Sequence, residues 1–243
     1  MTSPIFLSIV IPAYNEEARI AASLEAIYRY MAQQTYPYEL IVVDDGSTDL
    51  TASIVSEIFQ RKGHGILLRN ATNRGKGYSV RCGVLQTQGT YVLFSDADLS
   101  TPIREVEKFF PYLEQGYDIT IGSRGLQESD VQIHQAWYRE YMGKTFNRIV
   151  RILLLRGFAD TQCGFKCFRG EVARKLFVRQ QITHFSFDVE ILFLAHHHHY
   201  RVKEVPIQWF NEPHSRVNAL HDSAKMFIDL LKIRYNAWAG KYE

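Results

Sequence analysis

The sequence predicts an α/β fold in which a central, mostly parallel β-sheet is flanked by helices. Short runs rich in Val, Ile and Leu alternate along the chain with longer stretches whose apolar residues recur at helical spacing. Such alternation, with short connections, is typical of a parallel sheet covered by helices on both faces. The 243 residues suffice for one large core, and the chain has no internal repeat, low-complexity stretch or linker. We therefore expect a single domain spanning 1–243.

Four strands are expected in the first half of the chain, each followed by a helix. The strands are predicted at 7–12, 39–43, 65–68 and 90–94. The helices are predicted to begin near Ile20, to span 51–60, to end near 85 and to span 102–114, where proline at the first helical position favours a helix start. Polar clusters follow the strands at 13–17, 44–49, 73–77 and 95–100. Since ligands of parallel α/β sheets bind at the carboxyl ends of strands, these clusters predict one site.

The second half is expected to add two strands and two long amphipathic helices. The strands are predicted at 117–121 and 200–207, and the polar segment 125–135 is expected to be a mobile loop. Helices are predicted at 137–156, 187–196 and 222–238. In the last one, the apolar set is Met226, Phe227, Leu230 and Leu231, and the basic set is Lys225, Lys232 and Arg234. Packing on the core is expected for both amphipathic helices, although their basic faces also suit an anionic membrane surface.

The distribution of charge favours an anionic ligand over nucleic acid. The net charge is only +2, but residues 1–123 carry 10 basic and 14 acidic side chains, whereas residues 124–243 carry 18 and 12. This asymmetry suits a metal site in the first half and an anionic partner in the second. Three cysteines without a zinc-ligand set favour a reducing compartment. With no signal peptide and no run of the roughly 20 apolar residues that cross a bilayer, we expect a cytoplasmic chain, at most peripheral on the cytoplasmic face of a membrane.

Asp96 and Asp98 are the candidate metal ligands. They directly follow the strand at 90–94, and both carboxylates can reach one cation if the backbone leaves the sheet there. Mg²⁺ is usually held by one or two carboxylates together with substrate phosphates. An isolated Asp-x-Asp pair is more often a solvated loop, so the neighbouring motifs have to decide.

Two other groups of potential metal ligands favour structural interpretations. The run His196–His199 lies at a predicted helix end and is expected to be a solvated terminus, with adventitious metal binding as the alternative. Cys163 and Cys167 lack a second cysteine pair, so packing is expected rather than a shared metal.

Four segments together resemble the family-2 glycosyltransferases of the GT-A (Rossmann-like) fold. These are Ile9–Glu17, Val42–Asp49, Asn73–Gly77 and Asp96–Asp98, in the family's order at consecutive strand ends. Later segments look like the branch that glucosylates dolichyl phosphate, namely Gly122–Arg124, Asp160–Lys166, Phe187–Glu190 and Glu204–Trp209. The resemblance covers nearly the whole chain. It implies inverting transfer of glucose from UDP-glucose to a polyprenyl phosphate, with Mg²⁺ or Mn²⁺ as cofactor.

The resemblance implies that residues 1–123 bind the nucleotide sugar and the metal. Asp96 and Asp98 would hold the ion against the diphosphate and neutralise charge on the leaving UDP. Asp45 resembles the residue that accepts a hydrogen bond from uracil. Lys76, between two glycines, would approach the base or ribose, with a solvated loop lysine as the alternative. The residues that would frame the nucleoside are Pro12, Tyr14, Asn15 and Glu16.

Residues 124–243 are expected to form the acceptor half. A phosphate acceptor is anionic near neutral pH, because its second pKa is about 6, so cationic positioning matters more than a strong base. Arg124 and Arg139 match acceptor-phosphate positions of the related dolichyl-phosphate mannose synthases, and a guanidinium suits bidentate phosphate binding. Arg216 stands where the family often has a lysine that contacts the diphosphate. Asp188 is expected near the sugar or acceptor, or alternatively as a helix N-cap.

Two other functions stay open on sequence grounds. The same fold and metal could serve GDP-mannose or another donor, or a glycan or soluble hydroxyl acceptor, in which case Asp188 or Glu190 would act as a base. A sugar-nucleotide-binding module without turnover is disfavoured by the intact Asp96 and Asp98. The predicted partners are a nucleotide sugar, a polyprenyl phosphate and a membrane surface, without nucleic acid.

Overall fold

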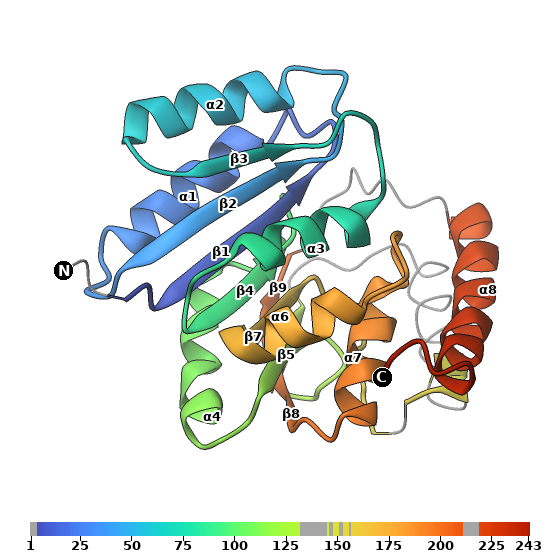
Figure 1. Cartoon of the computed structure of the whole chain (residues 1–243). Coiled ribbons are helices and arrows are strands. Elements are labelled where there is room, and N and C mark those ends of the chain that lie inside the picture. The colour runs from blue at the N-terminus through green and yellow to red at the C-terminus, as the bar shows by residue number, and fades with distance from the viewer. Residues whose placement is uncertain (1–3, 132–144, 146–147, 151–152, 156, 211–218) are drawn as a thin grey trace.

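A seven-stranded sheet forms the centre of the protein, with the strand order β3-β2-β1-β4-β7-β5-β8 (Figure 1). The computed structural model describes residues 4–131, 145, 148–150, 153–155, 157–210 and 219–243. The strands are β1 (Leu7–Ala13), β2 (Tyr38–Asp44), β3 (Ile66–Arg69), β4 (Tyr91–Ser95), β5 (Ile119–Ser123), β7 (Phe165–Arg169) and β8 (Val202–Pro206). A second, two-stranded sheet pairs β6 (Asp130–Val131) with β9 (Gln208–Trp209).

The large sheet is mostly parallel, as predicted. Only β7 runs against its neighbours, between β4 and β5, while the other pairs are parallel. The first four strands agree with the predicted ranges to within one residue at either end. Because β1 lies between β2 and β4, the carboxyl ends of these three strands lie side by side, and the polar segments that follow them meet there.

Helices cover both faces of the sheet (Figure 1). The first face carries α1 (Ile20–Met31), α2 (Thr51–Lys62), the 3-10 helix η1 (Ile103–Lys108) and α4 (Phe110–Glu114). The second face carries α3 (Lys76–Gln86), α6 (Gly170–Arg179), α7 (Phe187–His197) and α8 (Ala219–Trp238). In β1, Ile9 and Ile11 join the first core cluster and Val10 joins the second, because successive side chains point to opposite faces. A strand buried on both sides therefore reads as a continuous apolar run.

The predicted helix 102–114 is wrong, because η1 ends at Lys108 and α4 begins at Phe110. Pro111 explains the interruption. It lacks the N–H that a continuous helix would need, and its ring would clash with the carbonyl four residues earlier. Pro111 instead lies in the first turn of α4, where its missing N–H costs nothing.

Other differences lie in the second half. The predicted strand at 117–121 is β5, shifted by two residues, and the predicted late strand 200–207 is β8; β9, just beyond that range, was not predicted. Part of the predicted loop 125–135 forms β6, and both β7 and α6 lie in a region where neither was predicted. The predicted helix 137–156 lies largely outside the described residues. Within the described part of the chain, no helix combines the length and apolar character needed to cross a bilayer.

Candidate active site

The loops that follow β1 and β2 are joined to each other by hydrogen bonds. The backbone N–H of Asn15 donates to Ser47 Oγ (2.8 Å), and Asn15 Oδ1 accepts from the N–H of Thr48 (2.8 Å). Asn15 has a φ of 52°, in the left-handed region that asparagine tolerates better than most residues. On one side of this junction Pro12 is buried in β1, and Tyr14 is half-buried after it. The predicted nucleoside-framing residues therefore lie on one ordered junction.

Glu16 connects this junction to the predicted metal ligands. Its backbone N–H donates to Thr51 Oγ1 (2.7 Å), and its carboxylate pairs with the guanidinium of Arg19. Arg19 Nη1 in turn lies 3.8 Å from Asp98 Oδ2. Glu16 thus orients a cation that lies beside one of the two candidate ligands.

Asp45, predicted to contact uracil, is held by the loop that follows β3. Its Oδ1 accepts hydrogen bonds from Asn70 Nδ2 (2.7 Å) and the N–H of Arg74 (3.0 Å), and its Oδ2 accepts from the N–H of Gly75 (2.8 Å). The residue is almost fully buried. Its carboxylate therefore organises the loop, and its contact with a base stays a prediction.

Lys76 is the first residue of α3 and extends towards Asp96. Its Nζ lies 2.5 Å from Asp96 Oδ1 and within 6 Å of the ring centroids of Phe94 (5.8 Å) and Phe187 (5.9 Å). Burial lowers the pKa of Lys76, but the neighbouring carboxylates, Asp96 foremost, outweigh burial and raise it. The alternative of a solvated loop lysine is wrong.

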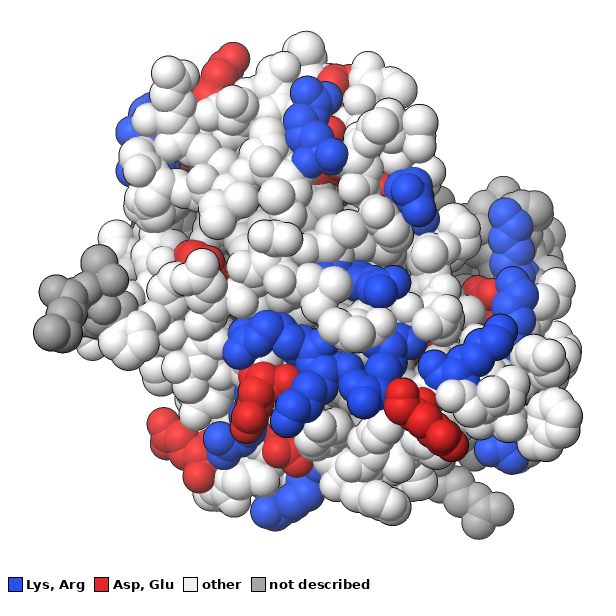
Figure 2. All heavy atoms as spheres, viewed as in Figure 1, with Lys and Arg blue, Asp and Glu red and all other residues white. Residues whose placement is uncertain are grey.

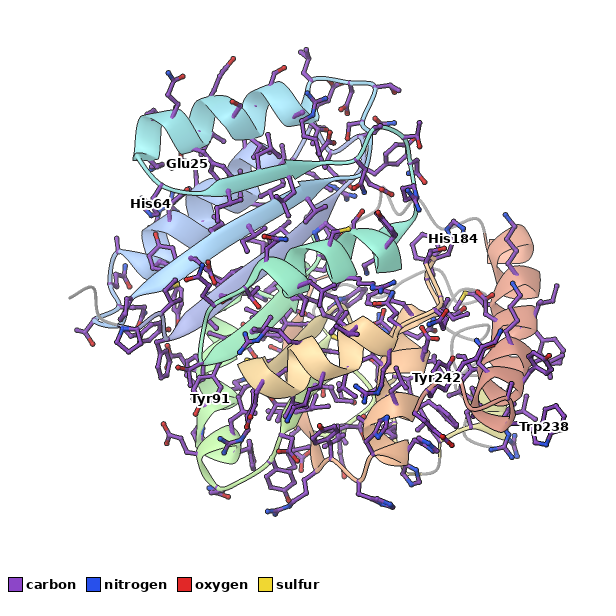
Figure 3. All side chains as sticks on the ribbon, viewed as in Figure 1. Glu25, His64, Tyr91, His184, Trp238 and Tyr242 are labelled. Atoms are coloured by element: carbon purple, nitrogen blue, oxygen red, sulfur yellow. The ribbon has the colours of Figure 1, made fainter. Side chains whose placement is uncertain are left out.

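The glycines on either side of Lys76 are required by the segment that leads into α7. A Cβ atom on Gly75 would lie 2.5 Å from His184 Nδ1, and one on Gly77 would lie 2.6 Å from Cβ of Phe187. Gly75 also has a φ of 100°, which side chains disfavour. Figure 3 shows His184 on the segment before α7. The close approach that these glycines permit is therefore, in this structure, to the protein's own chain.

Asp98 lies in the turn after β4, where the N–H of Ser100 donates to its Oδ1 (3.0 Å). Burial and the neighbouring charge of Asp96 raise the pKa of Asp98, against the effect of the hydrogen bonds from Ser100 and of Arg19. The two carboxylates therefore destabilise each other's charge. A cation bound between them would relieve this repulsion.

Asp188 forms a buried ion pair with Lys166 of β7. Lys166 Nζ lies 2.5 Å from Asp188 Oδ1 and also donates to the carbonyl oxygen of Cys163 (2.6 Å). Burial raises the pKa of Asp188, although Lys166 and Lys76 oppose this. The N-cap alternative is wrong, because Ser186 precedes α7 at the cap position and the Asp188 carboxylate binds β7 instead.

Glu190, the other candidate base, has a structural role. Its carboxylate accepts hydrogen bonds from the backbone N–H groups of Gln181 (3.0 and 3.1 Å) and Ile182 (2.8 Å) and from the hydroxyl of Tyr242 (2.6 Å). The side chain is fully buried. It ties the segment after α6 to the end of the chain.

Arg124 follows β5 and forms a bidentate pair with Asp160. Its Nε lies 2.6 Å from Asp160 Oδ2, and its Nη2 lies 3.0 Å from Asp160 Oδ1. The guanidinium carbon also lies 5.4 Å from the ring centroid of Trp209. Burial raises the pKa of Asp160, but Arg124 outweighs burial and brings it to about 2. Because a guanidinium has five N–H donors and Asp160 engages two of its groups, Arg124 is fixed in orientation and retains donors for an anion.

The remaining predicted residues divide between the described and undescribed parts of the chain. Arg139 and Arg216 lie outside the described residues. The run His196–His199 is exposed apart from His198, so the solvated helix end is confirmed. Cys163 and Cys167 are buried free thiols, as expected for packing residues.

Comparison with known proteins decides the family. A family model described as glycosyl transferase family 2 matches residues 8–177. The chain belongs to glycosyl transferase family 2. Among its relatives, the dolichyl-phosphate beta-glucosyltransferase of Dictyostelium discoideum is 34% identical, with 97% of this chain and 76% of the relative aligned. The enzyme of the same name from Saccharomyces cerevisiae is 35% identical, with 98% and 77% aligned.

Solved structures support the GT-A fold of this family 2 glycosyltransferase. Mannosyl-3-phosphoglycerate synthase from Rubrobacter xylanophilus superposes with a TM-score of 0.71 at 18% identity, covering 98% of this chain and 75% of the other. Glucosyl-3-phosphoglycerate synthase from Mycobacterium tuberculosis, solved with Mn²⁺, UDP-glucose and phosphoglyceric acid, gives 0.69 at 17% identity, covering 93% and 78%. The predicted fold class is confirmed.

The carboxylates of the glycosyltransferase fit a metal that is shared with substrate. Among the described residues, no group of three or more His, Cys, Asp or Glu side chains could hold an ion by itself. Asp96 and Asp98 are two oxygen-bearing ligands, and burial together with the charge of Asp96 raises the pKa of Asp98. Mg²⁺ commonly keeps several waters and is completed by substrate phosphates, so two carboxylates suffice.

The loop at 159–164, which leads into β7, positions Asp96, a role that no local sequence pattern indicates. The carbonyl oxygen of Gly164 accepts a hydrogen bond from the N–H of Asp96 (3.0 Å). A Cβ atom on Gly164 would lie 2.0 Å from Asp96 Oδ2. Only glycine therefore leaves room for the carboxylate in its present position.

A residue near the start of this loop and one in β7, just after it, hold other predicted site residues. Asp160 binds Arg124, and Lys166 binds Asp188. Glu204 of β8 accepts hydrogen bonds from two backbone N–H groups at the start of the loop, at 2.9 to 3.1 Å. The loop thus connects the predicted metal ligands to the predicted acceptor side of the glycosyltransferase.

Asp160→Asn is expected to lower the free energy of unfolding by about 2 kcal/mol at neutral pH. The folded-state pKa of about 2 lies below the ordinary value of 3.8, so folding favours the ionised form. This contribution is complete above about pH 4 and is lost as the pH falls towards 2. Urea unfolding of both proteins at descending pH should show the difference shrinking. An equal difference at every pH would assign the effect to packing alone.

Proposed function

We propose that this enzyme transfers glucose from UDP-glucose to a dolichyl-type polyprenyl phosphate, with inversion and with Mg²⁺ or Mn²⁺. The observation that carries the sugar and the acceptor is the similarity, over nearly the whole chain, to enzymes named dolichyl-phosphate beta-glucosyltransferase. Support for the donor and metal comes from the fold neighbour solved with Mn²⁺ and UDP-glucose. In this proposal residues 1–123 form the donor and metal half, and residues 124–243 form the acceptor half.

Asp96 and Asp98 are the proposed metal ligands. The ion would neutralise charge that develops on the leaving diphosphate. Three neighbours orient the two carboxylates before any ligand arrives. Lys76 binds Asp96, the N–H of Ser100 binds Asp98, and Arg19 lies beside Asp98.

The nucleoside is proposed to bind at the junction of the loops after β1 and β2. A carboxylate has about four acceptor positions, and Asp45 uses three of them within the protein. One position stays for the N–H of a uracil ring. The residues proposed to contact the nucleoside are Pro12, Tyr14, Asn15, Glu16, Asp45 and Lys76.

Arg124 is proposed to bind the acceptor phosphate. Asp160 fixes the guanidinium plane, so its remaining donors are oriented before the acceptor arrives. A phosphate oxygen that attacks the anomeric carbon from the side opposite UDP would invert the configuration. Arg139 and Arg216, which lie outside the described residues, are proposed to contribute further positive charge on the resemblance alone.

The surroundings of Asp188 and Glu190 favour a phosphate acceptor over a hydroxyl. A hydroxyl acceptor needs a base with an available oxygen. Asp188 is paired with Lys166, and Glu190 binds two backbone N–H groups and a tyrosine hydroxyl. An anionic phosphate has no such need. We propose that Asp188 positions the charges around Lys76 and does not remove a proton.

A transfer assay tests this proposal. The protein is incubated with Mn²⁺, a short polyprenyl phosphate, and labelled UDP-glucose, UDP-galactose or GDP-mannose in parallel. We expect label in the organic phase with UDP-glucose, a β-linked product by NMR, and loss of transfer with EDTA. If a lipid product forms only from GDP-mannose, the proposed donor is wrong. If glucose is transferred only to water-soluble acceptors, the proposed acceptor is wrong.

Arg124→Lys is expected to raise the KM for polyprenyl phosphate about tenfold, the effect of losing roughly one charge-assisted hydrogen bond. Lysine is a point charge and cannot keep the bidentate pair with Asp160 while it binds phosphate. The KM for UDP-glucose should change little. Arg104→Lys, at an exposed arginine of η1, is the matched control. An unchanged acceptor KM would remove Arg124 from the acceptor site.

A further inference from the structure

Helix α8 carries two apolar faces, where the sequence predicted one. Met226, Leu230 and Ile233 are buried, and the last two belong to the core cluster on the second face of the sheet. Phe227 and Leu231, predicted to share the apolar face with Met226 and Leu230, are instead exposed. The core therefore accounts for only part of the apolar surface of this helix.

The outer face of α8 is formed by five large exposed side chains. Their exposed fractions are 43% for Phe227, 52% for Ile228, 51% for Leu231, 58% for Tyr235 and 85% for Trp238. At 3.6 residues per turn they fall within a sector of about 100°, opposite the buried side chains. Figure 3 shows Trp238 pointing away from the body of the molecule. A contiguous apolar stripe of this kind on a helix marks an interaction surface.

Basic side chains border this stripe on both sides. Arg234 lies beside one edge of the stripe, and Lys225 and Lys232 lie beside the other edge. All three side chains are exposed. Figure 2 shows Lys and Arg side chains along α8, beside uncharged residues on its outer edge. Among residues 225–238 the only acidic side chain is Asp229, which is nearly buried and lies 3.3 Å from Lys232. The outer surface of α8 in this range is thus apolar and positively charged.

We propose that the outer face of α8 docks on an anionic lipid bilayer, with its axis in the headgroup region. Tyrosine and tryptophan prefer this region, where a ring meets both apolar and wet surroundings. Basic side chains at the edges extend towards lipid phosphates while their alkyl stems cover apolar surface. An apolar face of limited depth bordered by Lys and Arg is the pattern of a helix that lies on a membrane.

Packing of this face against a second copy of the chain is disfavoured by its charge. A two-fold contact centred on the stripe would bring the basic edges of two helices together. The one acidic residue of 225–238 already faces Lys232. An anionic bilayer supplies the missing negative charge.

This inference rests on the proposed function, because a lipid acceptor requires the enzyme to approach a membrane. The position of α8 agrees with this requirement. Figure 1 shows the arrowheads of β1, β2 and β3 pointing to the upper right and α8 at the right edge of the molecule. A bilayer on the outer face of α8 would therefore lie on the half of the molecule towards which these strands run.

Vesicle flotation tests the docking face with the full chain. Wild-type protein should float with phosphatidylcholine vesicles that contain phosphatidylglycerol. Leu231→Gln and Trp238→Gln should each weaken partitioning about tenfold, the effect of one large apolar side chain left in water. Val178→Gln on α6 is the matched control, because Val178 is 55% exposed but lies outside the stripe. Equal partitioning of all four proteins would overturn the proposal.

The basic edges have a separate signature. Lys225→Gln and Arg234→Gln should each weaken binding to anionic vesicles about fivefold and leave binding to neutral vesicles unchanged. Lys175→Gln, at an exposed lysine of α6, should bind as the wild type does. If Lys175→Gln weakens binding as much as the edge variants do, the protein binds anionic vesicles through its general positive charge and not through a defined face.

Two further measurements separate the possible outcomes. Sedimentation without lipid should show a monomer. A dimer that Leu231→Gln and Trp238→Gln dissociate would assign the stripe to a second copy and overturn the proposal. Transfer to a short acceptor in detergent should be normal in these variants, whereas transfer to a long-chain acceptor in vesicles should fall with flotation. Flotation without glucosyl transfer would overturn the proposed function alone, and transfer without flotation would overturn the docking face alone.

Discussion

Gly164→Ala is expected to reduce glucosyl transfer by about a hundredfold or more while the protein stays folded. A Cβ atom at this position would lie 2.0 Å from Oδ2 and 2.5 Å from Oδ1 of Asp96. Alanine must therefore displace the carboxylate, which also pairs with Lys76 at 2.5 Å. Gly164 has no positive φ, so its backbone conformation does not exclude alanine. A shift of about 1 Å in a catalytic group costs roughly this factor in rate.

Three measurements test this expectation. Mn²⁺ affinity and transfer rate should both fall in Gly164→Ala, while the thermal midpoint should move little. Gly122→Ala provides the control, because a Cβ atom on Gly122 would lie at least 3.1 Å from its neighbours, which a small shift relieves. A folded Gly164→Ala protein with normal metal affinity and rate would show that the position of Asp96 does not matter for transfer.

Strands β1, β2 and β4 were predicted to within one residue because their side chains are mostly buried on both faces. In β1, β2 and β4 nearly every position is apolar, so the run itself marks the strand. β7 was not predicted as a strand, because Lys166 at its second position interrupts the apolar pattern. That lysine is tolerated in the core only because Asp188, 22 residues later, neutralises it. A partner so distant in sequence cannot be inferred from a local pattern.

The candidate site shows the same division between residue type and pairing. The order of the motifs placed Asp45 and Asp96 at the carboxyl ends of strands in one parallel sheet, and in the structure only β1 lies between those two strands. The partners in the ion pairs could not be predicted. Lys76 pairs with Asp96, and Arg124 pairs with Asp160. Both pairs join segments that lie far apart in the sequence, so no local pattern reveals them.

Helix α8 illustrates a different limit. Helical periodicity identifies which side chains share a side of the helix, but both of its apolar sectors satisfy that periodicity. Which sector faces the core is settled by the position of the helix against α7. Phe227 and Leu231 were therefore predicted to lie on the buried face, although the fold leaves them exposed.

Asp98→Asn is expected to lower transfer at least about a hundredfold, because the ion would lose an anionic ligand that stabilises charge on the leaving group. Asp98→Cys makes the test specific for metal binding. A thiolate is a poor ligand for Mg²⁺ and a better one for softer ions. Asp98→Cys should therefore be inactive with Mg²⁺ and recover part of its activity with Mn²⁺ or Cd²⁺.

The design separates a metal ligand from a carboxylate that only shapes the turn. The turn role, through the N–H of Ser100, would be lost in both variants whichever ion is present. Glu57→Gln, at an exposed carboxylate of α2, controls for the general loss of negative charge and should keep full activity with every ion. If Asp98→Cys is equally weak with Mg²⁺, Mn²⁺ and Cd²⁺ yet folded, Asp98 acts through the turn. Rescue by the softer ions without a change in fold would assign the ion to Asp98, because a thiolate that binds the metal directly favours soft ions over Mg²⁺.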